Sequence, residues 1–68
     1  MKAPTPLYWY ALREAADILD VSPEALRRQF ERRAQKAPDG VQEARVDDVR
    51  ARKFRNRWRV SFGKAWTE

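Results

Sequence analysis

Arginine side chains are the residues of this chain whose type and spacing suggest chemistry. The segment from Val49 to Phe62, VRARKFRNRWRVSF, contains no acidic residue. Seven basic side chains lie between residues 50 and 64: Arg50, Arg52, Lys53, Arg55, Arg57, Arg59 and Lys64. If Arg55 and Asn56 form the turn of a β-hairpin, Arg52 faces Arg59, and like charges opposed across two strands destabilise the pairing. A sequence that keeps such a pair indicates another use for the charge, and we expect its ligand to be a polyanion.

A second basic cluster lies near the middle of the chain. It consists of Arg27, Arg28, Arg32, Arg33 and Lys36, diluted by Glu24 and Glu31, and it follows an acidic stretch that holds Glu14, Asp17 and Asp20. The net charge is +5. Two basic zones beside an acidic zone favour nucleic acid as the partner. We expect the arginines of both zones to form one continuous cationic footprint for a duplex.

The composition argues against catalysis. The chain has neither Cys nor His, so the commonest ligands of zinc and the commonest general base are missing. Its carboxylates are scattered, and no general base lies nearby in sequence to make Ser22 or Ser61 a nucleophile. We therefore expect no enzyme and no cofactor or metal. No apolar run approaches the ~20 residues that span a bilayer, and the N-terminal residues lack an apolar h-region of the signal-peptide type. We therefore expect a cytoplasmic protein without a membrane partner.

Sixty-eight residues suffice for one domain. We expect a flexible tail over residues 1–6, MKAPTP, and a single domain over residues 7–68. Residues 7–10 predict a short extended segment. Leu12, Ala15, Ala16 and Leu19 follow the spacing i, i+3, i+4, i+7 and predict the apolar face of a helix.

A second helix is predicted from Pro23 to about Gln35. Ser22 is a suitable N-cap, and proline fits the first helical position. Leu26 and Phe30 should pack on the first helix. The outward, mostly cationic side should carry Glu24, Arg27, Arg28, Glu31, Arg32 and Gln35. A turn follows at Pro38 to Gly40.

The arginine-rich segment predicts a hairpin with one apolar and one cationic face. Val49, Ala51, Trp58, Val60 and Phe62 should face the core, with Arg50, Arg52, Arg57 and Arg59 on the opposite side. A two-residue turn would favour Gly after Asn, so a wider loop over residues 53–57 is the alternative. Residues 41–48 fit a strand, a helical turn or a loop, and residues 61–66 suggest a last helical turn.

Two segments carry a family resemblance. The stretch from Leu12 to Arg28, LREAADILDVSPEALRR, resembles the opening of phage excisionases and of the DNA-binding domains of the MerR superfamily. The RWRV sequence at Arg57 to Val60 resembles the segment that closes the wing in excisionase-like domains. The region of resemblance that they mark spans roughly residues 8 to 62. The resemblance implies a small α+β winged helix-turn-helix with two main helices, a short N-terminal extended segment and a C-terminal hairpin wing. The chain departs from the pattern at Asp20, which replaces the usual turn glycine, and in the longer link that follows Gln35.

The resemblance also implies a function, namely sequence-specific binding of double-stranded DNA by a recombination directionality factor or a small transcriptional regulator. The second helix would enter the major groove, bringing Glu24, Arg27, Arg28, Arg32 and Gln35 to base edges or phosphates. The wing would place Arg50, Arg52, Arg55, Arg57 and Arg59 on phosphates or in a minor groove. Because one small domain covers only a short site, we expect a homodimer or cooperative binding along DNA.

Two other function classes fit the sequence. One is a protein-interaction adaptor of the same fold that docks an acidic partner or self-associates through exposed aromatic residues. The other is binding of RNA or single strands, with Phe54 or Tyr8 stacked on bases.

Overall fold

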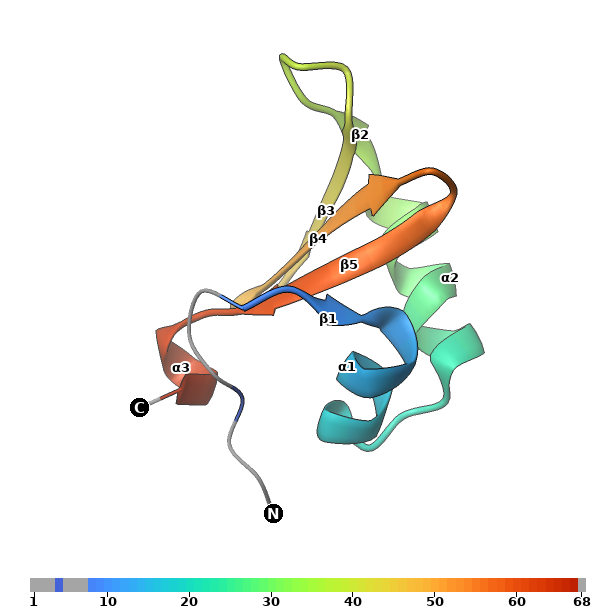
Figure 1. Cartoon of the computed structure of the whole chain (residues 1–68). Helices are drawn as coiled ribbons and strands as arrows, with labels where there is room; N and C mark the ends of the chain where they lie inside the picture. The colour runs from blue at the N-terminus through green and yellow to red at the C-terminus, as the bar shows by residue number, and fades with distance from the viewer. Residues whose placement is uncertain (1–3, 5–7, 68) are drawn as a thin grey trace.

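The chain folds as an α+β domain in which helices cover one face of an antiparallel sheet (Figure 1). The computed structural model describes residue 4 and residues 8–67. Within that part it has three helices and five strands, with the strand order β1-β5-β4-β3-β2. The elements are β1 (Tyr10–Ala11), α1 (Leu12–Leu19), α2 (Pro23–Arg33), β2 (Gln35–Lys36), β3 (Gln42–Val46), β4 (Val49–Phe54), β5 (Arg57–Phe62) and α3 (Lys64–Thr67). The predicted tail lies outside the described residues except for Pro4, which is buried.

The first helix forms where the apolar spacing predicted it. Ala15 and Ala16 are fully buried on its inner side. Ala11 offers no side-chain cap, but its own N–H donates to the Glu14 carboxylate at 3.2 Å. Asp20 ends the helix in the left-handed region, with φ of 58°. Asp adopts this conformation more readily than most non-glycine residues, so the turn tolerates the missing glycine.

The second helix starts as predicted and ends two residues early. The Ser22 hydroxyl accepts a hydrogen bond from the N–H of Ala25 at 3.1 Å, and Pro23 takes the first turn. Leu26 and Phe30 are buried. After Arg33 the backbone becomes extended, and Gln35 pairs with β3 in strand β2. The prediction that Gln35 belongs to the helix was therefore wrong.

The hairpin of β4 and β5 has the predicted register throughout. Arg55 and Asn56 form its turn, with φ of 49° and 65°. Positive φ at both positions is the signature of a tight type I′ turn, so the alternative of a wider loop was wrong. Arg52 lies opposite Arg59, and Val49, Ala51, Trp58, Val60 and Phe62 are all buried as expected.

Residues 41–48, for which the sequence allowed several structures, contain the strand β3. β3 pairs with β4 through a second tight turn, in which Asp47 has a φ of 53°. Ala44 is buried on the side that faces the helices, while Arg45 is exposed on the other side. β3 thus widens the sheet beyond the two-stranded wing that the resemblance implies.

The C-terminal helix starts later than predicted. β5 continues to Phe62, and α3 begins at Lys64. The N–H of Gly63 donates to the carbonyl of Asp48 at 2.7 Å, and the Asp48 carboxylate accepts from the N–H of Ala65 at 2.9 Å. Asp48 thereby joins the end of the β3–β4 turn to the start of α3.

The core lies between the helices and the sheet. Phe30 of α2, with no exposed surface, packs against the Trp58 ring at a centroid distance of 5.5 Å. None of the helices in residues 8–67 has the length and apolar character needed to cross a bilayer.

Candidate nucleic-acid interface

The outward side of α2 carries exposed charged side chains. Glu24, Arg27, Arg28 and Arg32 are all exposed, and burial of Leu26 and Phe30 fixes which side of the helix they occupy. Arg27 lies 3.9 Å from Glu24, a loose surface pair that leaves the arginine available. Four of the five residues predicted on this helix therefore share an exposed face, and Gln35 does not.

Glu31, also predicted to face outward, is turned toward the hairpin. Its carboxylate lies 2.9 Å from Nζ of Lys53 and accepts a hydrogen bond from the Trp58 indole N–H at 3.2 Å. The hydrogen bond from Lys53 is the main cause that holds the pKa of Glu31 below its ordinary value. These contacts join α2 to the β4–β5 hairpin, close to its turn. The charge of Lys53 is consequently compensated within the fold.

Carboxylates from other segments partly neutralise the arginine ribbon, which we define as Arg50, Arg52, Arg55, Arg57 and Arg59 of the β4–β5 hairpin. Arg52 forms an ion pair with Asp39, and its Nε lies 3.2 Å from the Glu43 carboxylate, although the Nε–H is not aligned with it as a hydrogen bond. Glu43 also lies 3.8 Å from Arg50. Hydrogen bonds from Arg52 and then from the N–H of Val41 lower the pKa of Asp39. The ribbon sequence contains no acidic residue, yet carboxylates from other segments neutralise part of its charge.

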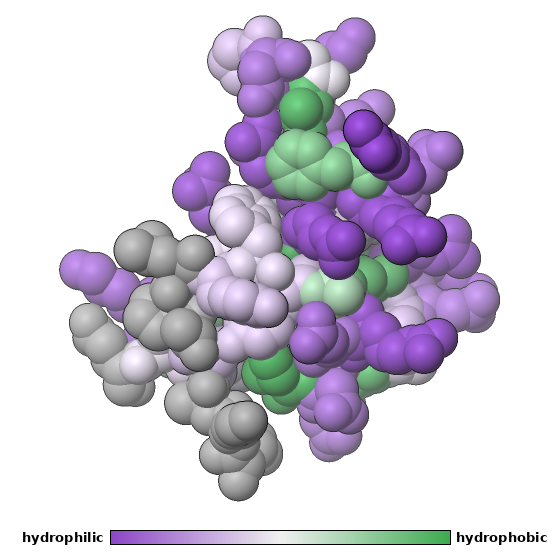
Figure 2. Space-filling view, in the orientation of Figure 1, coloured by the Kyte–Doolittle hydropathy of each residue, from purple (hydrophilic) through white to green (hydrophobic). Residues whose placement is uncertain are grey.

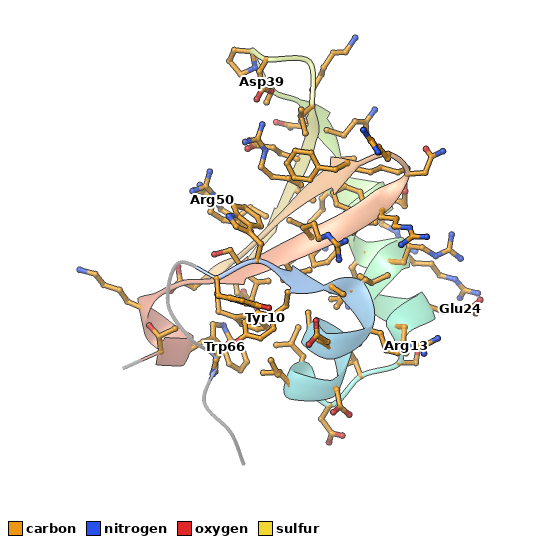
Figure 3. All side chains as sticks on the ribbon, in the orientation of Figure 1. Tyr10, Arg13, Glu24, Asp39, Arg50 and Trp66 are labelled. Atoms are coloured by element: carbon orange, nitrogen blue, oxygen red, sulfur yellow. The ribbon has the colours of Figure 1, made fainter. Side chains whose placement is uncertain are left out.

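The exposed arginines of α2 and the outward-facing arginines of the β4 and β5 strands lie on opposite sides of the molecule. The expectation of one continuous cationic footprint was therefore wrong. Helix α2 packs on the face of the sheet that contains Trp58 and Val60. The side chains of Arg50, Arg52, Arg57 and Arg59 alternate with the buried ones and therefore belong to the other face. Figure 3 labels Arg50 and Glu24 on opposite sides of the molecule.

The turn of the β4–β5 hairpin differs from the rest of the ribbon. Arg55 and Asn56 are exposed at its end, next to Lys53, which reaches Glu31 of α2. Arg55 lies between the two hairpin residues that contact Glu31, two residues after Lys53 and three before Trp58. Arg57 follows the turn and is exposed opposite Phe54.

A group of cations lies at the edge of β3, and of these only Arg50 was predicted from the sequence as a binding residue. Beyond its short pairing with β2, the edge of β3 borders an open groove of about 610 Å³. Its lining includes the cations Arg33, Lys36, Arg45 and Arg50, together with Glu43. The alternation of Ala44 and Val46 with Glu43 and Arg45 is the strand signal that could have identified Arg45. On the face of the molecule seen in Figure 2, hydrophilic residues cover much of the area, and the hydrophobic ones form small separate areas.

Within residues 8–67 and residue 4, no group of three or more acidic side chains is arranged to hold a metal ion. Comparison with protein-family models, curated proteins and solved structures finds no match for this chain.

Proposed function

We propose that this protein binds double-stranded DNA with sequence preference, using the exposed side of α2 together with the turn of the β4–β5 hairpin. In this proposal α1, the connection from Asp20 to Ser22 and α2 act as a helix-turn-helix, and the hairpin acts as its wing. Either a recombination factor or a transcriptional regulator would use such a module.

The observation that carries the proposal is the attachment of the hairpin to α2. Lys53 and Trp58 both contact Glu31, which keeps the hairpin turn beside the helix that carries the exposed arginines. A helix and a neighbouring basic turn are the two contacts that a winged helix-turn-helix makes with a duplex.

The roles of the residues follow from their positions on α2. Arg28 and Arg32 lie one helical turn apart on the exposed side and would reach base edges in the major groove. Glu24 and Arg27 lie nearer the start of the helix and would contact the next bases or phosphates. Arg55 would bind phosphates or enter the minor groove beside the turn.

Selection of bound fragments from a random duplex library, at two salt concentrations, tests the proposal. An enriched sequence is expected, and its affinity should fall with salt by about 0.9 log units per log unit for each phosphate contacted. R28A/R32A should lose most of the preference, because a bidentate arginine–guanine contact discriminates by about 1–3 kcal/mol.

The matched control is Arg13→Ala, which removes an exposed cation from α1. R13A should retain the preference, and R55A should weaken all duplexes about equally. A library that yields no enriched sequence, or a preference that survives in R28A/R32A, would contradict the proposal.

A further inference from the structure

The face of the sheet turned away from the helices carries an excess of positive charge. By strand register it carries Arg45, Arg50, Arg52, Arg57 and Arg59 against Glu43, with Asp39 of the β2–β3 turn paired to Arg52. Arg45 lies opposite Arg50, and Arg52 lies opposite Arg59. Two directly opposed like-charge pairs on one face destabilise the sheet. We call these five arginines the outer arginine face.

Three members of this face have no compensating charge in the described part of the chain. Ion pairs engage Arg50 and Arg52, whereas none joins Arg45, Arg57 or Arg59 to a carboxylate in residues 8–67. All five cations are arginines, whose guanidinium groups remain charged and match phosphate oxygens in a bidentate manner. The chemistry favours a phosphate polymer as the ligand.

A single duplex seated on α2 does not account for this face. The helices and the core lie between the exposed side of α2 and the outer arginine face, and the domain measures 34 × 22 × 19 Å. Reaching both surfaces would require one duplex to reverse direction around the domain. Known protein-induced bends of 40–90° extend over 20–30 base pairs, so reversal over so short a path is strongly disfavoured.

We infer that the outer arginine face binds the phosphates of a second DNA segment, so that one molecule bridges two duplexes. This inference rests on the proposed function, which supplies the first duplex on α2. Binding at the outer face is independent of sequence, because it depends on phosphates rather than base edges. Glu43 limits this binding, since its carboxylate occupies Arg50 and Arg52.

A capture experiment with two duplexes tests the bridge. One duplex contains the selected site and is attached to beads, while the other has an unrelated sequence, carries a fluorophore and is free in solution. Wild-type protein should retain the labelled duplex on the beads. R45T/R59T should lower the amount retained at least tenfold and reduce its salt dependence by about two phosphate contacts. Threonine keeps the strand propensity at both positions.

The matched control is R13A/K64A, which removes the same charge from α1 and α3. It should bridge at least fivefold better than R45T/R59T, and both variants should bind the attached duplex with similar affinity. E43Q should increase the amount of labelled duplex retained, because it releases Arg50 and leaves Asp39 as the remaining carboxylate on Arg52. Circular dichroism and urea unfolding of each variant establish that it is folded.

The outcomes separate the two proposals. Failure of wild-type protein to bind the attached duplex would overturn the proposed function. Binding of that duplex without retention of the labelled one would overturn only the bridge. Equal retention of the labelled duplex by R45T/R59T and R13A/K64A would also overturn the bridge. So would a competition experiment in which polyglutamate displaces the labelled duplex from the outer arginine face more effectively than unlabelled duplex does.

Discussion

Glu31 of α2 accepts a hydrogen bond from the indole N–H of Trp58, the second residue of β5 after the hairpin turn, while binding Lys53 on the neighbouring strand. One carboxylate therefore connects a helix to two strands that are more than twenty residues away in sequence. This connection sets the position of the hairpin turn relative to α2.

The first prediction concerns acid stability. Because the pKa of Glu31 is lowered by folding, the unfolded chain takes up a proton first as the pH falls. The stabilisation from this group should be complete above its ordinary pKa of 4.5 and should disappear as the pH drops through the lowered folded value. Urea unfolding between pH 3 and 7 should show a shallower acid loss for E31Q than for wild type. K53M should resemble E31Q, and an unchanged acid profile in both variants would contradict this role of Glu31.

The second prediction distinguishes Arg52 from its cross-strand neighbour Arg59. Arg52 binds two carboxylates and lies over the Phe54 ring at 5.6 Å, so R52T should lower the free energy of unfolding by about 1 kcal/mol. R59T relieves the like-charge pair and should be neutral or stabilising by about 0.5 kcal/mol. Urea unfolding of the two variants, side by side at low salt, gives the comparison. Equal losses of unfolding free energy in R52T and R59T would mean that the ion pairs of Arg52 do not stabilise the fold.

The third prediction concerns the hairpin turn. Asn56 has a φ of 65°, where glycine pays no steric cost. N56G should raise the unfolding free energy by about 0.5–1 kcal/mol, since an Asn or Asp followed by Gly is favoured in this turn type. N56A should lower it. Neither variant alters the charge, so thermal unfolding and DNA affinity can be compared directly, and a destabilised N56G would argue against the tight turn.

The fourth prediction concerns Gly63. A Cβ atom at this position would overlap the carboxyl group of Asp48, which caps α3 through the N–H of Ala65. G63A should therefore cost about 1–2 kcal/mol, comparable to the loss of a helix cap. With D48A already present, the added effect of G63A should be much smaller, because the overlapping group is gone. Additive losses in the double variant, measured by urea unfolding, would rule out this explanation.

Local sequence signals predicted a large part of the fold. The alternation of apolar residues and arginines determined the β4–β5 register, and Ser22 with Pro23 marked the start of α2. The end of α2 was not predictable in this way, because Gln35 leaves the helix to pair with Glu43 of β3, a contact between segments. Residues 41–48 were ambiguous because the turn at Asp47 lacks a glycine.

The candidate site was less predictable than the fold. The arginines were recognisable by type, but their compensation depends on Glu31, Asp39 and Glu43, which the fold brings to them from other segments. Burial of the alternate side chains also separates the ribbon arginines from those of α2. The charge clusters in the sequence therefore identified the basic residues without predicting that the fold places them on separate surfaces.

The short outer strands have a consequence for behaviour in concentrated solution. β1 and β2 contain two residues each, so they offer another copy few backbone groups for pairing. Lys36 of β2 and Arg45, on the part of β3 that extends beyond β2, add electrostatic repulsion between approaching copies. In the absence of DNA, light scattering should therefore detect isolated molecules at low ionic strength. Clustering should appear first when concentrated salt screens these charges.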